Sequence, residues 1–274
     1  MIDNICKFLA ETFSTDFASW ILGQPIILTK LEPSELSVEP IRADSVIFLE
    51  SAEIILHLEF QTEPNKNIPF RMADYRLRLY RKFPERKVHQ VVIYLSPSQS
   101  PLVYTTSFNL EELTHNFNVI RLWEQPTAIL QQYQGLLPFA ALSQTSNPEE
   151  TLRQVARQIE KIADKQVQSN VAASTAIISG IALNKEIIQR LLRSEIMKES
   201  VIYQEILLEG KAEGKAEGKA EERNKIALNM LRSNIAIDLI SQFTGITLKQ
   251  IQKLQKLSTK KASTPKSKKT NRST

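Results

Sequence analysis

Two acidic side chains and one amide stand at the ends of two short apolar stretches of this 274-residue chain. Asp44 directly precedes the first stretch, at 45–49, and fourteen residues separate it from Glu59, which Gln61 follows two positions later. If the stretches at 45–49 and 53–61 pair as a hairpin, Asp44 lies opposite the strand end that holds Glu59 and Gln61. One carboxylate from each strand then meets at one end of a sheet, an arrangement that suits a divalent cation such as Mg²⁺.

The alternation of residue types along the second stretch separates a core face from a polar face. Leu56 and Leu58 are expected to face a core, while His57, Glu59 and Gln61 face the other way. A bound Mg²⁺ would lower the pKa of a water molecule and stabilise charge on a phosphodiester. Gln61 is able to orient that water but cannot supply the positive charge of a lysine. The alternative interpretation is an ordinary solvated sheet face, since polar residues alternate on such faces and aspartate is common at strand ends.

A basic helix is predicted directly after these strands, at residues 69–86. Arg71, Tyr75, Arg78 and Lys82 follow one another at spacings of four, three and four, which places them on one side of the helix. A basic stripe that includes a tyrosine suits a phosphate backbone, so these four residues are predicted to bind DNA. A solvated helix face is the alternative, because an acidic residue interrupts the stripe.

The candidate site and its flanks resemble a known family. Asp44 and the run Glu59-Phe60-Gln61 are similar to the PD-(D/E)XK nuclease pattern in its E-x-Q form. More specifically, residues 1 to about 225 resemble the Rpn family of recombination-promoting nucleases and transposases. The stretches that carry this resemblance are "IRADSVIFL", "ILHLEFQTE", "RMADYRLRLY", "LLPFAALSQ" and "MKESVIYQEILLEGKAEGKAEGKAE". The resemblance implies a restriction-endonuclease-like fold and Mg²⁺-dependent DNA cleavage, associated with recombination or mobile elements.

The resemblance also implies roles for individual residues. Asp44 and Glu59 would be metal ligands, and Gln61 stands at the usual lysine position. Many members of this superfamily take a further acid from the first helix, for which Glu11 is best placed, although a solvated helix face explains Glu11 equally well. The predicted function is a Mg²⁺-dependent endonuclease, a hydrolase with Asp44, Glu59 and Gln61 as its catalytic residues. The alternative is a catalytically weak DNA-binding or assembly protein that retains the fold, since Gln61 weakens charge stabilisation.

Helices and strands alternate in the part of the chain that would position these residues. In chain order the predicted elements are a helix at 2–22, strands at 36–41, 45–49 and 53–61, a helix at 69–86, and strands at 88–95 and 115–122. We therefore expect an α/β fold with a restriction-endonuclease-like core, in which helices flank a mixed central sheet. An all-α C-terminal region follows, with helices predicted at 128–134, 149–163 and 185–208.

Composition divides the chain into five segments. They are the nuclease-like core at 1–125, a helical extension at 126–209, a GKAE-repeat linker at 210–224, a small helical unit at 225–258 and a disordered basic tail at 259–274. The repeat predicts a partly helical connector, because its like-charged neighbours and glycines weaken a helix. Pairing with a second copy through the glycine and charge stripes is the alternative, and it would make the protein a homo-oligomer.

The small helical unit resembles a helix-turn-helix. Four of its apolar side chains are expected to face inward: Ile237, Leu239, Ile240 and Phe243. Gly245 lies in the predicted turn, and Thr247 with Gln250 forms a capping box at the start of the next helix. That helix carries Lys249 and Lys253, so contact with a DNA groove is one interpretation. A packing or dimerising hairpin is the other.

The composition is that of an ordinary soluble protein, with 42% apolar and 24% charged residues. The single cysteine, Cys6, excludes an intrachain disulfide and a cysteine-rich zinc site and fits a cytoplasmic location. No apolar run approaches the roughly 18 residues that cross a bilayer, so no membrane partner is expected. The last fifteen residues hold six basic residues and no acid, and subtracting those six from the net charge of +5 leaves −1 for the rest. No Ser/His/Asp set or phosphate-cradling glycine loop has usable spacing, which disfavours triad hydrolases and nucleotide-binding folds.

Overall fold

The computed structural model describes residues 2–31, 46–192, 194–197, 200–201, 203–204, 208, 219, 222–231, 233 and 235–262. Contacts divide the chain into two compact units, Met1–Ile206 and Leu207–Thr274. Asp44 and the strand predicted at 36–41 lie outside the described residues. So do most of the GKAE repeat and the last twelve residues of the basic tail, 263–274.

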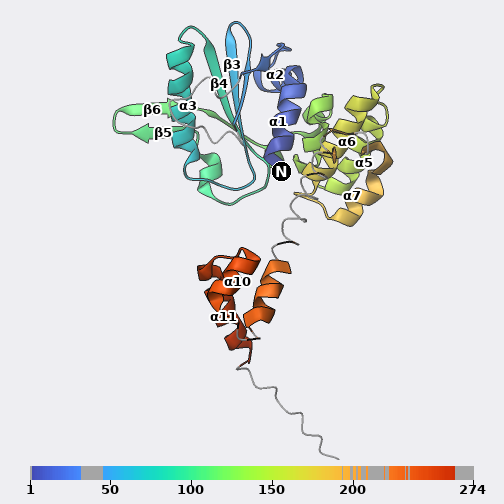
Figure 1. Ribbon diagram of the computed structural model, residues 1–274. Coiled ribbons are helices and arrows are strands. Elements are labelled where there is room, and N and C mark those ends of the chain that lie inside the picture. Colours follow the sequence, from blue (N-terminus) through green and yellow to red (C-terminus); the bar gives the residue numbers. More distant parts are fainter. Residues whose placement is uncertain are drawn as a thin grey trace, which may run out of the picture. The chain divides into compact units, whose positions relative to one another are not determined.

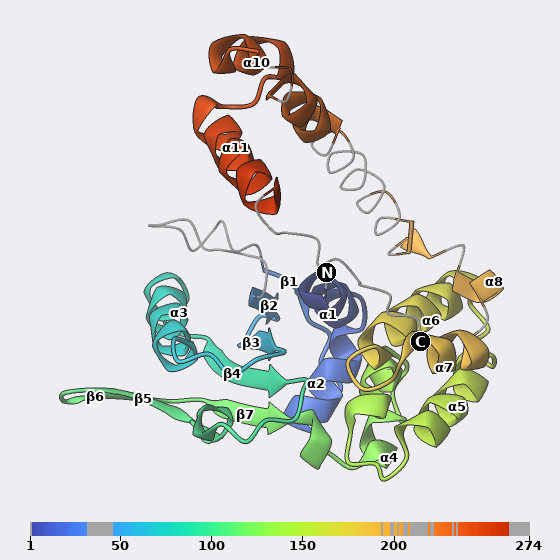
Figure 2. The same cartoon turned by 90° about the horizontal axis from the view of Figure 1, so that it is seen from below.

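A mixed five-stranded sheet forms the centre of the first unit, with its strands in the order β1-β2-β3-β4-β7 (Figures 1 and 2). The strands are β1 (Thr29–Lys30), β2 (Val46–Glu50), β3 (Ile54–Gln61), β4 (Lys87–Tyr94) and β7 (Asn118–Arg121). The pairs β1–β2 and β2–β3 are antiparallel, whereas β3–β4 and β4–β7 are parallel. The α/β class and the strands predicted at 45–49, 53–61 and 88–95 are thus confirmed, with ends shifted by one residue.

Helices cover both faces of this sheet. Figure 2 shows α1 (Ile2–Thr12) and α2 (Ser14–Leu22) on one face and α3 (Ile68–Lys82) on the other. Because β3 and β4 are parallel, the chain needs a crossover between them, and α3 supplies it. The helix predicted at 2–22 is two helices, which are separated at Phe13; the Ser14 hydroxyl donates a hydrogen bond to the Leu28 carbonyl.

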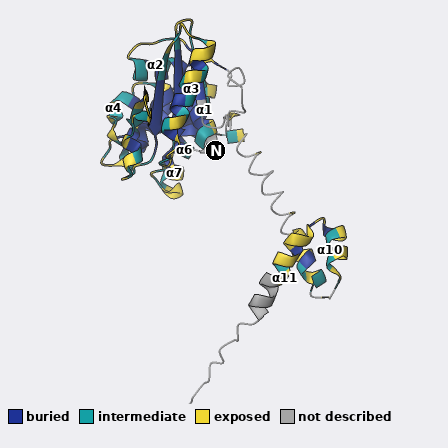
Figure 3. Cartoon of the chain, turned by 90° about the vertical axis from the view of Figure 1, so that its left-hand side faces the viewer, coloured by how far each residue is buried: buried dark blue, intermediate teal, exposed yellow. Residues whose placement is uncertain are grey.

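The residues of β3 explain this layered arrangement. Leu56, Leu58 and Phe60 face α1 and α2 in the main core, while Ile55 lies in a smaller cluster with Tyr75 of α3. The strand is buried from residue 55 to residue 60, so both of its faces are covered (Figure 3). The polar face of this strand is therefore not a solvated sheet face, because α3 lies over it.

A β-hairpin that the sequence did not predict precedes the last strand of the main sheet. It consists of β5 (Ser107–Leu110) and β6 (Leu113–Asn116), which form a separate two-stranded sheet. The single strand predicted at 115–122 is wrong, because this region contains the end of β6 and the whole of β7. Phe117, between them, is buried in a cluster with Val92 and Met72, which anchors the chain where it changes sheets.

The remainder of the first unit is helical. Its elements are the 3₁₀ helices η2 (Pro101–Tyr104), η3 (Leu122–Glu124) and η4 (Gln134–Leu142), and the α-helices α4 (Thr127–Leu130), α5 (Pro148–Ile159), α6 (Lys165–Ser179), α7 (Lys185–Leu191) and α8 (Ser194–Met197). The helix predicted at 128–134 is wrong in extent, since α4 ends at Leu130 and a 3₁₀ helix with an internal proline follows. The helix predicted at 185–208 is also interrupted, because α7 ends at Leu191. The helix α6 was not predicted.

One core joins the sheet to this helical part. The Phe60 ring of β3 stacks on the Phe139 ring of η4 with centroids 5.8 Å apart, and the Phe17 ring of α2 meets both edge-on. All three side chains belong to the largest buried cluster of the first unit. The predicted segments 1–125 and 126–209 therefore share a core. No helix among the described residues combines the length and the apolar character of a membrane span.

The second unit contains a helical run at 222–231 followed by α10 (Ile237–Thr244) and α11 (Leu248–Ala262). Its small core consists of Ala227, Ile240, Ile246 and Ile251. Gly245 ends α10 with φ 68°, a left-handed conformation that glycine adopts without strain. The helix α11 continues to Ala262, into the segment predicted as a disordered tail.

Two details of the second unit test the predictions made for it. The capping box is confirmed, because the Gln250 backbone N–H donates to Thr247 Oγ1 and the Thr247 N–H donates to Gln250 Oε1. The inward orientation predicted for Leu239 and Phe243 is wrong, since they are 46% and 74% exposed. The prediction is confirmed for Ile240, which is 0% exposed and packs in the core with Ala227 of the helical run at 222–231.

Candidate functional site

Glu59 occupies a central position in the sheet. It lies on β3, opposite Val46 at the start of β2 and beside Val92 of β4. Its side chain points to the face that α3 covers and is 0% exposed. A carboxylate is rarely buried this completely unless a cation or hydrogen-bond donors hold it.

An arginine of α3 provides that cation. Arg71 Nη2 lies 2.8 Å from Glu59 Oε1, and the Arg71 side chain is 26% exposed. The Gln61 amide Nε2 lies 3.5 Å from the other carboxylate oxygen, Oε2. Removing one partner of a buried ion pair commonly costs about 3–5 kcal/mol, so Glu59 and Arg71 hold β3 and α3 together as well as forming the centre of the site.

Two tyrosines complete the surroundings of this carboxylate. Burial raises the pKa of Tyr75, and the negative charge of Glu59 acts in the same direction. The pKa of Tyr94 is also raised, by burial first and by Glu59 second. The Tyr75 ring lies 6.0 Å from the Arg71 guanidinium carbon, so it flanks the ion pair on the α3 side. Both phenols therefore stay protonated at neutral pH and act as neutral groups.

A chain of polar side chains runs from His57 towards the surface. Gln90 Nε2 lies 2.8 Å from His57 Nδ1 and also donates to the Met72 carbonyl, and Gln90 Oε1 lies 2.7 Å from His115 Nε2. Burial lowers the pKa of His57 to about 3, with the positive charge of Arg71 as the second cause. His57 is therefore a neutral imidazole between the rings of Phe48 and Tyr75, whose centroids lie 4.7 Å and 5.2 Å away.

The four predicted DNA-binding residues have different environments. Arg71 pairs with Glu59, and Arg78 pairs with Asp74 at 3.0 Å. Tyr75 is 6% exposed and packs in the cluster under α3, while Lys82 is exposed and lies over the Phe83 ring. The exposed surface of α3 is mixed, because the basic residues Arg81 and Lys82 share it with Phe70, Leu77 and Tyr80, which are 57%, 55% and 57% exposed.

The other predicted ligands do not meet Glu59 among the described residues. Glu11 lies on α1, which covers the opposite face of the sheet, and its carboxylate is 3.8 Å from Lys30 Nζ. Asp44 lies outside the described residues, two positions before Val46. The part of the chain that the structure describes contains no group of three or more His, Cys, Asp or Glu side chains able to hold a metal. The Glu59 carboxylate and the Gln61 amide carbonyl nonetheless carry the oxygen ligands that Mg²⁺ prefers. These two side chains therefore fit part of the ligand set of a magnesium site.

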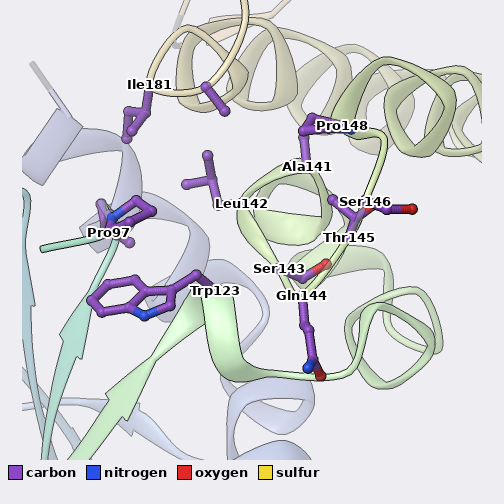
Figure 4. Close-up of a pocket in the computed structure, with 12 residues that line it drawn as sticks. Pro97, Trp123, Ala141, Leu142, Ser143, Gln144, Thr145, Ser146, Pro148 and Ile181 are labelled. Carbon is purple, nitrogen blue, oxygen red and sulfur yellow. The ribbon is translucent and has the colours of Figure 1, made fainter.

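A cavity in the first unit lies away from Glu59. It has a volume of about 570 Å³ and is lined by Pro97, Trp123, Leu142 and the segment Ser143–Ser146, among others (Figure 4). Figure 4 shows Trp123 and Pro97 on one side and the Ser143–Ser146 segment on the other. The described residues that line it are apolar or uncharged polar side chains.

Sequence reasoning missed the two residues that link His57 to the surface. Gln90 is a polar residue inside the apolar run of β4, and its amide bridges His57 and His115. That interruption was a usable signal, because a buried amide needs partners for its donor and acceptor. His115 comes from the unpredicted hairpin, so its approach to Gln90 had no signal in the local sequence.

Comparisons with known proteins give no further assignment. No protein-family model, no curated protein and no solved structure matches this chain. The function must therefore be argued from the site itself.

Proposed function

We propose that the first unit is a Mg²⁺-dependent DNA endonuclease of the PD-(D/E)XK type, with Glu59 as a metal-binding carboxylate. The observation that carries this proposal is Glu59 itself: a carboxylate that is 0% exposed on a central strand and faces a basic helix. Burying an ionised carboxylate is costly, so proteins retain such a group mainly where it has a partner or a chemical task. Apolar residues in place of both Glu59 and Arg71 would stabilise the sheet at least as well as this ion pair does.

The register of the sheet supports Asp44 as the second ligand. Val46 pairs with Glu59, and the two strands are antiparallel. Positions before Val46 therefore run towards the same end as positions after Glu59, which is the end where Gln61 lies. If this pairing continues two positions before Val46, Asp44 would reach that end.

The order of the elements supports a restriction-endonuclease-like core. Helices at the N-terminus, antiparallel strands, a crossover helix and a parallel strand follow one another, as the resemblance to the Rpn family implies. The helices after β7 and the second unit then correspond to the all-α C-terminal region. An association with recombination or mobile elements rests on the resemblance alone.

In this proposal the metal would supply an activated water and neutralise charge on the phosphodiester. Asp44 and Glu59 would hold it through carboxylate oxygens, and Gln61 would orient the water through its amide. Arg78 and Lys82 on α3 would bind the DNA backbone, because phosphate contacts to arginine and lysine provide most non-specific affinity. Tyr75 would support this surface from beneath rather than contact DNA, since it is buried.

A second candidate function is favoured by two observations at the same site. Glu59 already holds a cation, Arg71, and the position of the usual lysine is occupied by Gln61. Both fit a protein that has kept the fold but binds DNA or assembles without efficient cleavage. In the second unit, Arg223 and Lys253 line a cavity of about 410 Å³, which would serve such a protein as a contact for DNA or a second copy.

Cleavage of supercoiled plasmid distinguishes the two functions. Purified wild type should nick the plasmid with Mg²⁺ and not with EDTA, while Asp44→Ala and Glu59→Ala should lose this activity. Glu53→Ala is the matched control, because Glu53 is an exposed acid in the turn before β3 and should leave cleavage unchanged. Binding of plasmid by folded wild type without cleavage, in several divalent metals, would favour the second function. Cleavage that persists in both variants would show that the site has been wrongly assigned.

A further inference from the structure

The cation beside Glu59 comes from the protein itself. Arg71 Nη2 is 2.8 Å from Glu59 Oε1, and the carboxylate has no exposed surface, whereas a quarter of the arginine side chain is exposed. Arg71 therefore lies between the carboxylate and the solvent. An external cation that binds Glu59 through Oε1 takes over the oxygen that Arg71 now contacts.

The burial of Glu59 makes this a competition between two cations. A fully buried carboxylate without a partner is strongly disfavoured, so the site is stable with one cation or the other and not with none. Two cations on the same carboxylate oxygen repel each other in such surroundings. Binding of a divalent cation and retention of the Arg71–Glu59 contact therefore oppose each other.

We propose that Arg71 is a built-in counter-ion that a divalent cation displaces from Glu59, and that the displaced guanidinium then binds the DNA phosphate at this site. This inference rests on the proposed nuclease function and names the residue that supplies the positive charge absent at Gln61. In this role Arg71 is a catalytic residue of α3, and it also sets the metal affinity of the site.

The properties of Arg71 suit the second half of this role. It lies one turn into α3, and its side chain is partly exposed at the edge of the ion pair. A guanidinium presents donors in a planar fork that matches phosphate oxygens, and it stays charged in any environment. The Tyr75 ring at 6.0 Å provides an aromatic surface against which the released group is able to rest.

Calorimetric titration of Mn²⁺ into the metal-free full-length chain tests the competition. Arg71→Met removes the charge and keeps most of the volume, so its Mn²⁺ affinity should exceed that of wild type by about tenfold, a usual size for coupling between two ligands. Arg81→Met is the matched control, because Arg81 is an exposed arginine on the same helix and should keep the wild-type affinity. Glu59→Gln should lose binding whether or not Arg71 is present.

Chemical labelling of the wild type provides a measurement that does not depend on the folding of a variant. Phenylglyoxal modifies accessible arginines. Mass spectrometry of the peptide that contains Arg71 gives the rate at which Arg71 is modified. Saturating Mn²⁺ should increase the labelling rate of Arg71 and leave that of Arg81 unchanged. Addition of a DNA duplex together with Ca²⁺, which replaces Mg²⁺ to suppress cleavage, should then slow the labelling of Arg71 again.

The outcomes separate this inference from the proposed function. If wild type binds Mn²⁺ through Glu59 but Arg71→Met shows the wild-type affinity, or labelling of Arg71 does not respond to Mn²⁺, Arg71 is not displaced and the inference is wrong while the metal site stands. If neither wild type nor Arg71→Met binds any divalent cation, both the inference and the nuclease proposal fail. If metal exposes Arg71 but DNA does not protect it, the phosphate-binding half of the inference is wrong.

Discussion

Replacing His57 with phenylalanine should remove a pH-dependent loss of stability from the first unit. Burial lowers the pKa of His57 from 6.5 to about 3 in the folded protein. Between pH 6.5 and pH 3, His57 binds a proton in the unfolded chain but not in the folded chain. The contribution of His57 to the free energy of unfolding is therefore complete above pH 6.5 and is lost as the pH falls towards 3. At about 1.4 kcal/mol per pKa unit, lowering the pH from 6.5 to 4.5 should cost wild type roughly 2–3 kcal/mol through this residue alone.

The variant changes the packing little. Phenylalanine keeps an aromatic ring between Phe48 and Tyr75 and loses the contact with Gln90, which should cost about 1–2 kcal/mol at pH 8. At pH 8 the variant should therefore be less stable than wild type. This difference in the free energy of unfolding should shrink, and then reverse, as the pH falls to 4.5.

Urea unfolding followed by tryptophan fluorescence measures this difference, because Trp20 and Trp123 both lie in the first unit. Wild type, His57→Phe and the control His89→Gln should be compared at several pH values from 8 to 4.5. The control should follow the pH dependence of wild type. Parallel curves for wild type and His57→Phe would refute the argument, since they would show that His57 takes up its proton equally in both states.

Three further substitutions test the packing and the helix ends. Gly135→Ala should destabilise the first unit by about 3 kcal/mol, because a Cβ there would lie 2.2 Å from the Phe13 Cβ; an unchanged urea midpoint would contradict this close approach. Asn147→Ala should cost about 1 kcal/mol, since the Asn147 side chain accepts the Glu150 N–H at the start of α5; Asn147→Asp, which keeps the acceptor, should restore most of it in the same urea titration. Gly245→Ala should lower the stability of the second unit by about 1–2 kcal/mol because of its positive φ, measured by circular dichroism on the full chain; equal helix melting in the two proteins would refute it.

The sequence predicted the central strands because their signal is local. A run such as Ile54–Gln61 contains branched apolar residues and turn residues at its ends, and its pairing partner is only a few residues away. The same locality explains the success at Thr247, where the cap and its partner Gln250 are three positions apart. These features depend on neighbours that a short window contains.

The predictions that failed concern residues whose structure depends on neighbours far away in the sequence. Residues 115–122 were predicted as one strand, but Phe117 separates two strands because it finds a buried place against Met72 and Val92. Phe243 was expected in a core, yet nothing in the sequence indicated that the helical run at 222–231 packs on the other side of α10. The 3₁₀ helix η4 and the helix α6 were missed for a similar reason: a buried segment with an internal proline or many small residues has no amphipathic period.

The candidate site shows the same division. The alternation along β3 correctly placed His57 and Glu59 on a common face, since period two is a property of the strand itself. That this face lies beneath α3, and that Arg71 reaches Glu59 from that helix, required the crossover geometry. Arg71 was predicted to bind DNA because of its spacing on the helix. In the structure it contacts Glu59, so it would have to leave that carboxylate before it could bind DNA.

The central claim is that a divalent cation binds between the start of β2 and the end of β3, and iron-directed backbone cleavage tests it most directly. Fe²⁺ in place of Mg²⁺, with ascorbate, generates radicals that cut the polypeptide next to the metal, and mass spectrometry locates the cuts. The account predicts cuts near residues 44–46 and 59–61, suppressed by excess Mg²⁺ and absent in Glu59→Gln. Cuts elsewhere, or none in a folded protein that cleaves DNA, would contradict it.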